Sequence, residues 1–411
     1  MIRLKVMVEP QGPLILGKGM DSAQNVRESR DYIAGSVVRG ALAQTILERL
    51  HRHSTSRRQM PLGGTSEEQN AFETVFMGTS PARFGYLYPT YLQRNGTVDE
   101  SFPAPVTTRA CKPHTTQHQV LDTLRVFLRR QLPPSGCPQC GERIERWRGF
   151  LLRLSDGEYD YCARAPRRPL VRVGLNRWTE TAEERILYVL EAIVPRAEPD
   201  KPLAFVGHWT MSEKQWQQLQ VFLERFFLRE SAGYRLRLGS ARARGLGEVI
   251  LHCEETTFPD VSPRLDAFQN GLPDTEHYLY FSLTVRSPVL VYDETGLPAN
   301  SLTPTILRSY LPSVPDKLEL MEHATFVEAE SLSGWSQAWG LPKPVTSVIA
   351  AGSVFTYRVP KSEEDAVLNL LTAIETQGLG ERRAEGLGDL VACDPFHISH
   401  ESPMEVRDDA T

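Results

Sequence analysis

Apolar and polar positions alternate at the start of the chain, where Leu4, Val6 and Val8 face one way in a run of extended residues. This period of two predicts a strand over residues 4–8. Further on, Leu42, Ile46 and Leu50 recur at helical spacing. They predict a helix near 37–51, with Ser36 as its N-cap.

Two capping-box patterns predict the next helices. Thr181-x-x-Glu184 predicts a helix that ends before Pro195, and Ser212-x-x-Gln215 predicts one near 213–229. Strands are expected at 234–238 and 248–252, followed by a linker over 254–276.

The pattern then restarts. Residues 279–291 align without gaps on residues 4–16, an offset of 275, and the glycine-rich segment 380–390 aligns on 239–249, an offset of 141. Each glycine-rich segment follows a predicted helix, which in the second copy spans about 363–376 with Ser362 as N-cap. This internal duplication predicts an α+β protein with two ferredoxin-like domains in tandem.

The two offsets differ by 134 residues, so the first copy carries extra length. We expect a first domain over 1–253, with an insertion at about 100–180 that is rich in Cys and Arg. The linker over 254–276 leads to a second domain over 277–393 and an acidic tail over 394–411.

Composition narrows the class of protein. The 411 residues are 41% hydrophobic and 24% charged, an ordinary globular balance that excludes a disordered, coiled-coil or collagen-like chain. No apolar run approaches the ~18 residues of a membrane-spanning helix, and the N-terminus lacks a signal-peptide layout. We therefore expect a cytoplasmic protein with no membrane partner.

The net charge of −5 hides a basic segment. Residues 109–177 hold 14 Lys and Arg against 6 Asp and Glu, a net charge of +8, which leaves −13 for the other residues. Arg suits bidentate contact with phosphate. This segment therefore makes a polyanion partner plausible where the average charge does not, with a solvated surface as the alternative.

Four of the six cysteines lie in or near the basic segment, at Cys111, Cys137, Cys140 and Cys162. Cys137-Pro-Gln-Cys140-Gly is a knuckle that supplies half of a tetrahedral zinc site. Cys111 and Cys162 complete a four-Cys set, and His114 and His118 are competing ligands for the fourth position. We predict a structural Zn²⁺.

Two kinds of segment could bind phosphate through their backbone amides. The glycine-rich segments carry Gly245, Gly247, Gly386 and Gly388 beside Arg242, Arg244, Arg382 and Arg383. Their exposed amides can form an anion nest. The helix start at Gly35-Ser36, with Arg39 one turn later, offers amides and a positive dipole end. A tight turn and an ordinary helix cap are the structural alternatives.

These motifs resemble a known family. Tyr32-Ile-Ala-Gly-Ser36-Val-Val-Arg39-Gly-Ala-Leu resembles the Ile-Pro-Gly-Ser-x-x-Arg/Lys-Gly-Ala-Leu motif of the RAMP superfamily of CRISPR proteins, with Ala34 in place of Pro. The glycine-rich segments resemble that superfamily's loops. Residues 333–344, with Trp335 and Trp339, are similar to the second-half motif of two-domain subunits that cap type III complexes. The run 172–177 and the Cys knuckle most resemble the type III-D member, the Csx-ten family, a Cas-five-like subunit.

The resemblance implies a non-catalytic subunit that binds the 5′ tag of the guide RNA (crRNA). It also implies contact with the large signalling subunit and the backbone RAMP subunits, and with target RNA only indirectly. The residues expected to contact RNA are Ser36, Arg39, Arg167, Arg168, Arg172, Asn176, Arg177, Arg242, Arg244, Gly245, Gly247, Arg382, Arg383, Gly386 and Gly388. Trp147, Trp178, Trp335 and Trp339 are candidates for base stacking or for core packing.

Two enzymatic alternatives stay open. One is a metal-independent endoribonuclease that matures guide RNA, with His51 or His53 as general acid and base. The other is a backbone subunit that cleaves target RNA through Asp21 or Asp31. The duplicated layout and the Trp-rich second half favour the cap subunit.

Overall fold

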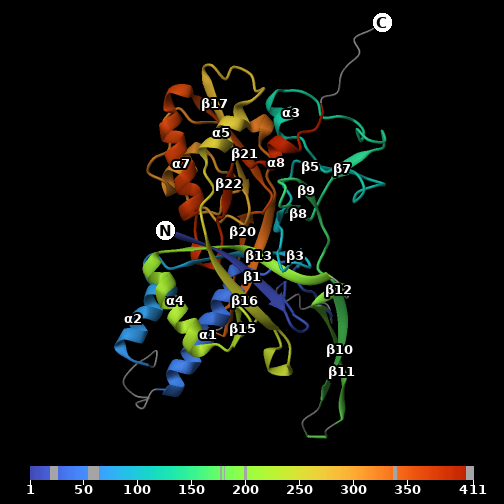
Figure 1. Cartoon of the computed structure of the whole chain (residues 1–411), viewed down its shortest axis with the longest axis vertical. Helices are drawn as coiled ribbons and strands as arrows, with labels where there is room; N and C mark the ends of the chain where they lie inside the picture. The colour runs from blue at the N-terminus through green and yellow to red at the C-terminus, as the bar shows by residue number, and fades with distance from the viewer. Residues whose placement is uncertain are drawn as a thin grey trace.

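The computed structural model describes residues 1–18, 26–53, 64–175, 178–179, 181–198, 201–336 and 340–403. Its described residues form an α+β structure with several antiparallel sheets, of which the two main ones follow each other along the long axis (Figure 1). We call residues 1–256 the first half and residues 257–403 the second half. Each half has its own hydrophobic core. Among the described helices, none is long and apolar enough to cross a membrane.

The first sheet is built around β1 (Ile2–Pro10), where Leu4, Val6 and Val8 are fully buried, as their alternation predicts. β1 lies between β13 and β16, and all three pair antiparallel. The other strands of this sheet, with β3 beside β13, are β3 (Arg83–Tyr91), β12 (Arg196–Glu198), β13 (Lys201–Met211), β14 (Arg229–Glu230), β15 (Gly233–Arg237) and β16 (Glu248–Thr256).

Three helices cover one face of this sheet, and they are α1 (Gly35–His53), α2 (Ser66–Phe76) and α4 (Glu213–Phe226). The predicted capping box on α4 is confirmed, since Ser212 and Gln215 bond to each other's backbone amides. The helix predicted near 37–51 is confirmed as α1. It begins at Gly35, so Ser36 lies in its first turn and does not precede it as an N-cap.

The second sheet repeats the design, with strand order β18-β21-β17-β22. Its strands are β17 (Tyr278–Val285), β18 (Glu319–Leu320), β21 (Val354–Pro360) and β22 (Leu390–Ala392). The helices of this half are α5 (Ser262–Gln269), α6 (Pro304–Tyr310), α7 (Glu364–Gln377) and α8 (Phe396–Ser399). The predicted helix near 363–376 is confirmed as α7. A short 3-10 turn, η3 (Lys361–Glu363), takes up Ser362, so Ser362 is not the N-cap.

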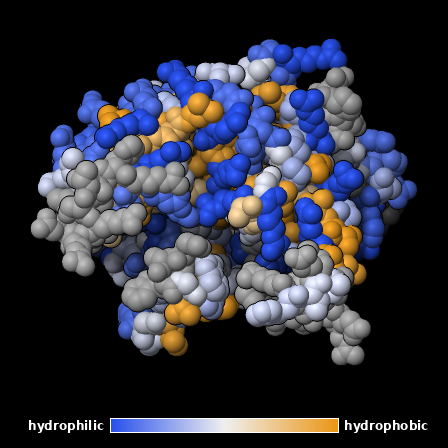
Figure 2. All heavy atoms as spheres, turned by 90° about the horizontal axis from the view of Figure 1, so that it is seen from below, coloured by the Kyte–Doolittle hydropathy of each residue, from blue (hydrophilic) through white to orange (hydrophobic). Residues whose placement is uncertain are grey.

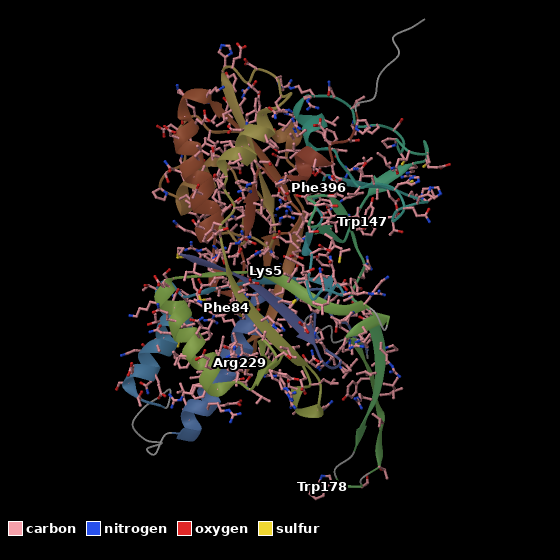
Figure 3. The ribbon with its side chains drawn as sticks, viewed as in Figure 1. Lys5, Phe84, Trp147, Trp178, Arg229 and Phe396 are labelled. Atoms are coloured by element: carbon pink, nitrogen blue, oxygen red, sulfur yellow. The ribbon has the colours of Figure 1, made fainter. Side chains whose placement is uncertain are left out.

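Each half also carries a β-hairpin. In the first half, β10 (Arg167–Leu175) and β11 (Ala182–Ile193) pair antiparallel, with β2 (Val26–Arg27) beside β11. The helix predicted from Thr181-x-x-Glu184 is therefore wrong. The run of apolar and β-branched residues that follows is extended because it pairs with β10, and tertiary pairing overrides the capping pattern. The hairpin projects from the body, with Trp178 at its tip (Figures 1 and 3).

In the second half the hairpin consists of β19 (Ala329–Ser336) and β20 (Leu341–Ile349). Both hairpins join their halves through the same bridge. Leu14 pairs with Ile193, and Val289, which is 275 residues after Leu14, pairs with Ile349. Residues 167–175, which we assigned to the insertion, thus belong to a hairpin that has a counterpart in the second half.

The remaining strands follow β3 and precede β10 along the chain. They are packed beside the second half (Figure 1). We call residues 100–162 the cysteine-bearing segment. It contains β4 (Glu100–Pro103), β5 (Thr108–Cys111), β6 (Leu121–Asp122), α3 (Leu124–Leu128), β7 (Ile144–Arg146), β8 (Phe150–Arg153) and β9 (Tyr159–Cys162). Leu124 and Leu128 of α3 are buried in the core of the second half.

Two regions expected to be irregular are partly ordered against the second core. The expected linker, 254–276, includes α5, whose Leu265 and Phe268 are buried there. The expected acidic tail begins with α8, where Phe396 and His397 are buried. Both segments therefore contribute to packing, and residues 404–411 lie outside the described part of the chain.

Candidate RNA interface and metal cluster

Cysteine and histidine side chains meet at the end of β5. The ligand atoms of Cys111, His114, His118 and Cys140 all lie within 4.8 Å of one another. The Cys111 Sγ is 3.6 Å from the Cys140 Sγ and 3.8 Å from the His114 Nδ1, and the Cys140 Sγ is 3.9 Å from the same nitrogen. These separations are close to the edges of a zinc tetrahedron with bonds of about 2.0–2.3 Å.

The predicted knuckle forms a tight turn in which Cys137 is buried and Cys140 is exposed. Gly141 adopts a positive φ of 76°, and its amide bonds to the Cys137 carbonyl at 2.7 Å. Burial raises the pKa of Cys137, but the backbone N–H groups of Gln139 and Cys140 outweigh it and lower the pKa overall. The loop is thus shaped to stabilise a thiolate, the form that binds a metal.

The ligand set differs from the four-cysteine prediction. Cys162 lies apart from the cluster on β9, where its buried thiol bonds to the Pro89 carbonyl at 3.0 Å. Cys137 stays close, with its Sγ 3.3 Å from the His118 Nδ1. His114 and His118, the competing ligands, join the cluster because a short turn after Cys111 returns them to it. Two thiolates and two imidazoles suit zinc, so this Cys/His cluster fits the metal.

Several basic side chains of the basic segment pair with acidic residues, and four of these arginines pair with two glutamates of the second half. Arg125 and Arg129 both pair with Glu401, and Arg146 and Arg148 both pair with Glu328. The surplus of Arg in this segment therefore serves in part to hold it against the second half.

Arg167 is also engaged. Its guanidinium pairs with Asp31 at 2.6 Å and with Glu191 at 2.5 Å, and it is only a quarter exposed. Although we expected Arg167 to contact RNA, the structure places it between two carboxylates. Asp31 in turn is tied to Arg167, while Asp21 lies outside the described residues.

An uncompensated group of arginines remains at the first glycine-rich loop, residues 239–247. This loop contains the 3-10 turn η1 (Arg242–Arg244), and the exposed Gly245 comes directly after the turn. Arg244 donates to the Tyr188 hydroxyl on β11. Arg172 on β10 is the cross-strand partner of Tyr188, so their side chains share one face.

The face of the hairpin next to this loop carries Arg168 as well, two residues from Leu170, which packs against the loop. Arg168, Arg172 and Arg244 are exposed. Within the described part of the chain, no carboxylate lies within ion-pairing distance of these three side chains. The structure thus brings together Arg172 and Arg244, which are 72 residues apart in sequence. Seen from below, the described surface of the molecule is a mixture of hydrophilic side chains and smaller hydrophobic patches (Figure 2).

The second glycine-rich loop, residues 380–388, has the same backbone but a different setting. It contains η4 (Arg383–Glu385), and Gly386 and Gly388 are buried. Glu385 accepts from Lys343 of β20 at 2.8 Å and pairs with Arg382 at 2.7 Å. Burial raises the pKa of Glu385, but Arg382 and Lys343 outweigh it and lower the pKa.

The start of α1 lies under this second loop. A Cβ on Gly35 would stand 1.6 Å from the carbonyl oxygen of Phe84 and 2.7 Å from that of Glu385, so only glycine fits. Arg39 donates to the carbonyl of Phe76 at the end of α2. The helix start that we expected to bind phosphate is therefore covered by the protein's own backbone.

A family model for the RAMP superfamily matches residues 8–250, which is more than half of the chain. This chain belongs to the RAMP superfamily. No curated protein sequence matches it significantly.

Solved structures of CRISPR proteins give weak matches. A chain of the type III-B Cmr-beta complex, bound to cognate target RNA and AMPPnP, is 14% identical with a TM-score of 0.41, and the match covers 89% of this chain and 88% of that one. Cas6 in a product complex is 16% identical with a TM-score of 0.29, over 47% and 79% of the two chains. A chain of a type IV-B CRISPR complex is 12% identical with a TM-score of 0.26, over 63% and 92%. At these values the similarity says nothing about activity or ligand.

The remaining candidates of this RAMP protein are scattered. Trp147 packs against the core of the cysteine-bearing segment, edge to face with Tyr161. Trp335 on β19 is half exposed, and Trp178 is exposed at the tip of the first hairpin (Figure 3). His51 is exposed near the end of α1. Asn176, Arg177, Trp339 and the side chain of His53 lie outside the described residues.

Tyr188 and Lys343 were missed by the sequence analysis, because Tyr188 belongs to no motif and Lys343, although it lies within residues 333–344, was not singled out there. Their roles depend on which loop each hairpin contacts. The alignment of the two glycine-rich segments does contain one usable signal, since Arg244 stands opposite Glu385.

Proposed function

We propose that this RAMP protein is the non-catalytic cap subunit that binds the 5′ tag of crRNA in a type III-D CRISPR interference complex. In this proposal the two halves are tandem ferredoxin-like domains, and the cysteine-bearing segment is an insertion in the first. The large signalling subunit and the backbone RAMP subunits are its protein partners, and target RNA is reached through them.

The observation that carries the proposal is the exposed first glycine-rich loop with its uncompensated arginines. Arg244 from the loop and Arg168 and Arg172 from β10 form one positively charged face beside Tyr188. Single-stranded RNA is bound by cationic side chains along its phosphates, by backbone amides and by aromatic rings. This face offers the cationic side chains and an aromatic ring, whereas the amides of Ser240, Arg244, Gly245 and Gly247 are bonded within the protein.

Zinc is a structural part of the proposal. Cys111, His114 and Cys140 would hold the ion, with His118 or Cys137 as the fourth ligand. A saturated site of this kind stabilises the fold and leaves no open position for a reaction. Its place at the end of β5 would fix the loops of a segment whose small core also includes Phe396 of α8.

The experiment that tests the proposal is incubation of the purified protein with end-labelled repeat RNA, with Mg²⁺ and with EDTA. We expect binding of the tag and no cleavage under either condition. Site-specific cleavage that is lost on His51→Ala would contradict the proposal and favour a guide-maturing endoribonuclease. Cleavage that requires Mg²⁺ and is lost on Asp31→Ala would instead favour a target-cleaving subunit.

A further inference from the structure

The two glycine-rich loops share one backbone. Ala241 and Arg382, which are equivalent positions, both have the left-handed conformation, with φ of 58° and 55°. The amide of Gly247 bonds to the Pro13 carbonyl at 2.9 Å, and that of Gly388 bonds to the Pro288 carbonyl at the same distance. The loops therefore differ in function, if at all, through their side chains and surroundings.

Their surroundings differ at one glycine. A Cβ on Gly245 would meet nothing within 4 Å, whereas one on Gly386 would stand 2.3 Å from the carbonyl oxygen of Phe84. Phe84 lies on β3 of the first half (Figure 3). The second loop is thus pressed against the first half at the very place where the first loop is open to solvent.

The hairpins that flank the loops show the same contrast. In the second half, Leu332, Val348 and Leu387 form a cluster with Tyr86 and Tyr88 of β3. In the first half, the equivalent cluster of Ile15, Leu190, Ala192 and Leu246 has no such aromatic strand against it among the described residues. One copy of this surface is covered by β3, whereas no strand of the described part of the chain covers the other in this way.

The charge at one equivalent position is reversed. Glu385 of the second loop lies between Lys343 and Arg382, and it acts favourably on Arg39 of α1. Arg244 takes its place in the first loop and faces Tyr188 and Arg172. A cationic side chain at this position would repel a protein surface like the start of α1, but it attracts a polyanion.

We infer that the duplicated loop has been divided between two roles. The first glycine-rich loop binds RNA. The second loop stabilises the interface between the two halves and does not contact RNA. The residue at position 244 or 385 sets the role, with Arg for phosphate and Glu for the interface. The RNA-binding role of the first loop rests on the proposed function. The interface role of the second loop rests on the contacts of Glu385.

The test uses matched variants of the full chain. Fluorescence anisotropy measures affinity for a labelled single-stranded RNA that carries the repeat-derived tag, and thermal melting measures stability. Arg244→Glu is expected to weaken RNA binding about tenfold or more without lowering Tm. Arg383→Glu, the exposed arginine of the second loop, is expected to leave affinity within about twofold.

The interface role of the second loop is tested separately, by thermal melting. Glu385→Gln is expected to lower Tm by several degrees and leave RNA affinity unchanged, because it removes a half-buried carboxylate shared by Lys343 and Arg382.

The outcomes are distinguishable. Equal loss of RNA affinity in Arg244→Glu and Arg383→Glu would contradict the division of roles. An unchanged Tm in Glu385→Gln would contradict the interface role of the second loop. Failure of the wild-type protein to bind the tag would instead refute the proposed function, and with it the RNA-binding role of the first loop.

Discussion

Asp122 of the cysteine-bearing segment and His397 of α8 meet 3.0 Å apart, with both side chains fully buried. The Asp122 carboxylate also accepts from the Thr107 hydroxyl and the Leu124 amide, and the far nitrogen of His397 bonds to Thr284 at 2.8 Å. The order of Thr, His and Asp resembles a hydrolase triad, but Thr284 is itself fully buried. This network therefore ties the segment to the second half.

Replacing Asp122 with Ala should destabilise the protein strongly. The change leaves His397 and the Leu124 amide without their buried partner, and loss of one member of such a pair costs about 3–5 kcal/mol. Urea unfolding followed by tryptophan fluorescence measures it. Lys18→Ala, which removes the exposed pair with Glu28, is the control and should cost less than about 1 kcal/mol. Equal costs would contradict the role of the buried network.

Metal content should follow the ligand set seen in the structure. Purified protein should carry about one equivalent of zinc, since a saturated structural site binds one ion. Cys140→Ser should lose it, whereas Cys162→Ser, in which the altered residue lies on β9 beside Pro89, should retain it. Elemental analysis by mass spectrometry gives the result. Loss of zinc in Cys162→Ser would restore the four-cysteine assignment.

The salt dependence of RNA binding should separate free arginines from paired ones. Removing Arg172, which is exposed and has no carboxylate partner among the described residues, should reduce the slope of log K against log salt by about 0.7. Arg146→Ala is the control, because Arg146 is paired with Glu328. The prediction is contradicted if both variants change the slope equally.

Stability should fall in acid partly through one histidine. Burial, helped by Arg3, lowers the pKa of His208 to about 4, against the opposing effect of Glu100. In the unfolded chain the His208 imidazole binds a proton near pH 6.5, whereas in the folded chain it does not. The contribution of His208 to the free energy of unfolding is therefore complete above pH 6.5. It is lost as pH falls toward 4, by at most about 1.4 kcal/mol per pH unit.

His208→Gln should therefore flatten the dependence of unfolding free energy on pH between 6.5 and 4. Urea titrations at four pH values in this window, on the wild type and the variant, give the two slopes. Parallel slopes would show that His208 does not titrate differently in the folded and unfolded chains.

The parts of the fold that sequence predicts are those where local pattern and tertiary contacts agree. The alternation at Leu4, Val6 and Val8 and the capping box at Ser212 gave the right elements. The capping box at Thr181 gave the wrong one, because pairing with β10 decides the conformation of β11. A local signal does not contain the partner strand.

The site was predictable in its residue types and much less so in its arrangement. Cys111 and Cys140 were recognised from spacing, but Cys162 is separated from them by its position on β9. Both glycine-rich segments were recognised as one motif, and only packing shows that Gly386 is covered while Gly245 is open. Contacts between distant segments make these distinctions.

The most direct test of the central claim is crosslinking of the 5′ tag to this subunit in an assembled crRNA complex, with crosslinked peptides mapped by mass spectrometry. The account predicts crosslinks on residues 168–172 and 242–247 and none on residues 380–388. Crosslinks concentrated on 380–388, or absent from this subunit altogether, would contradict it.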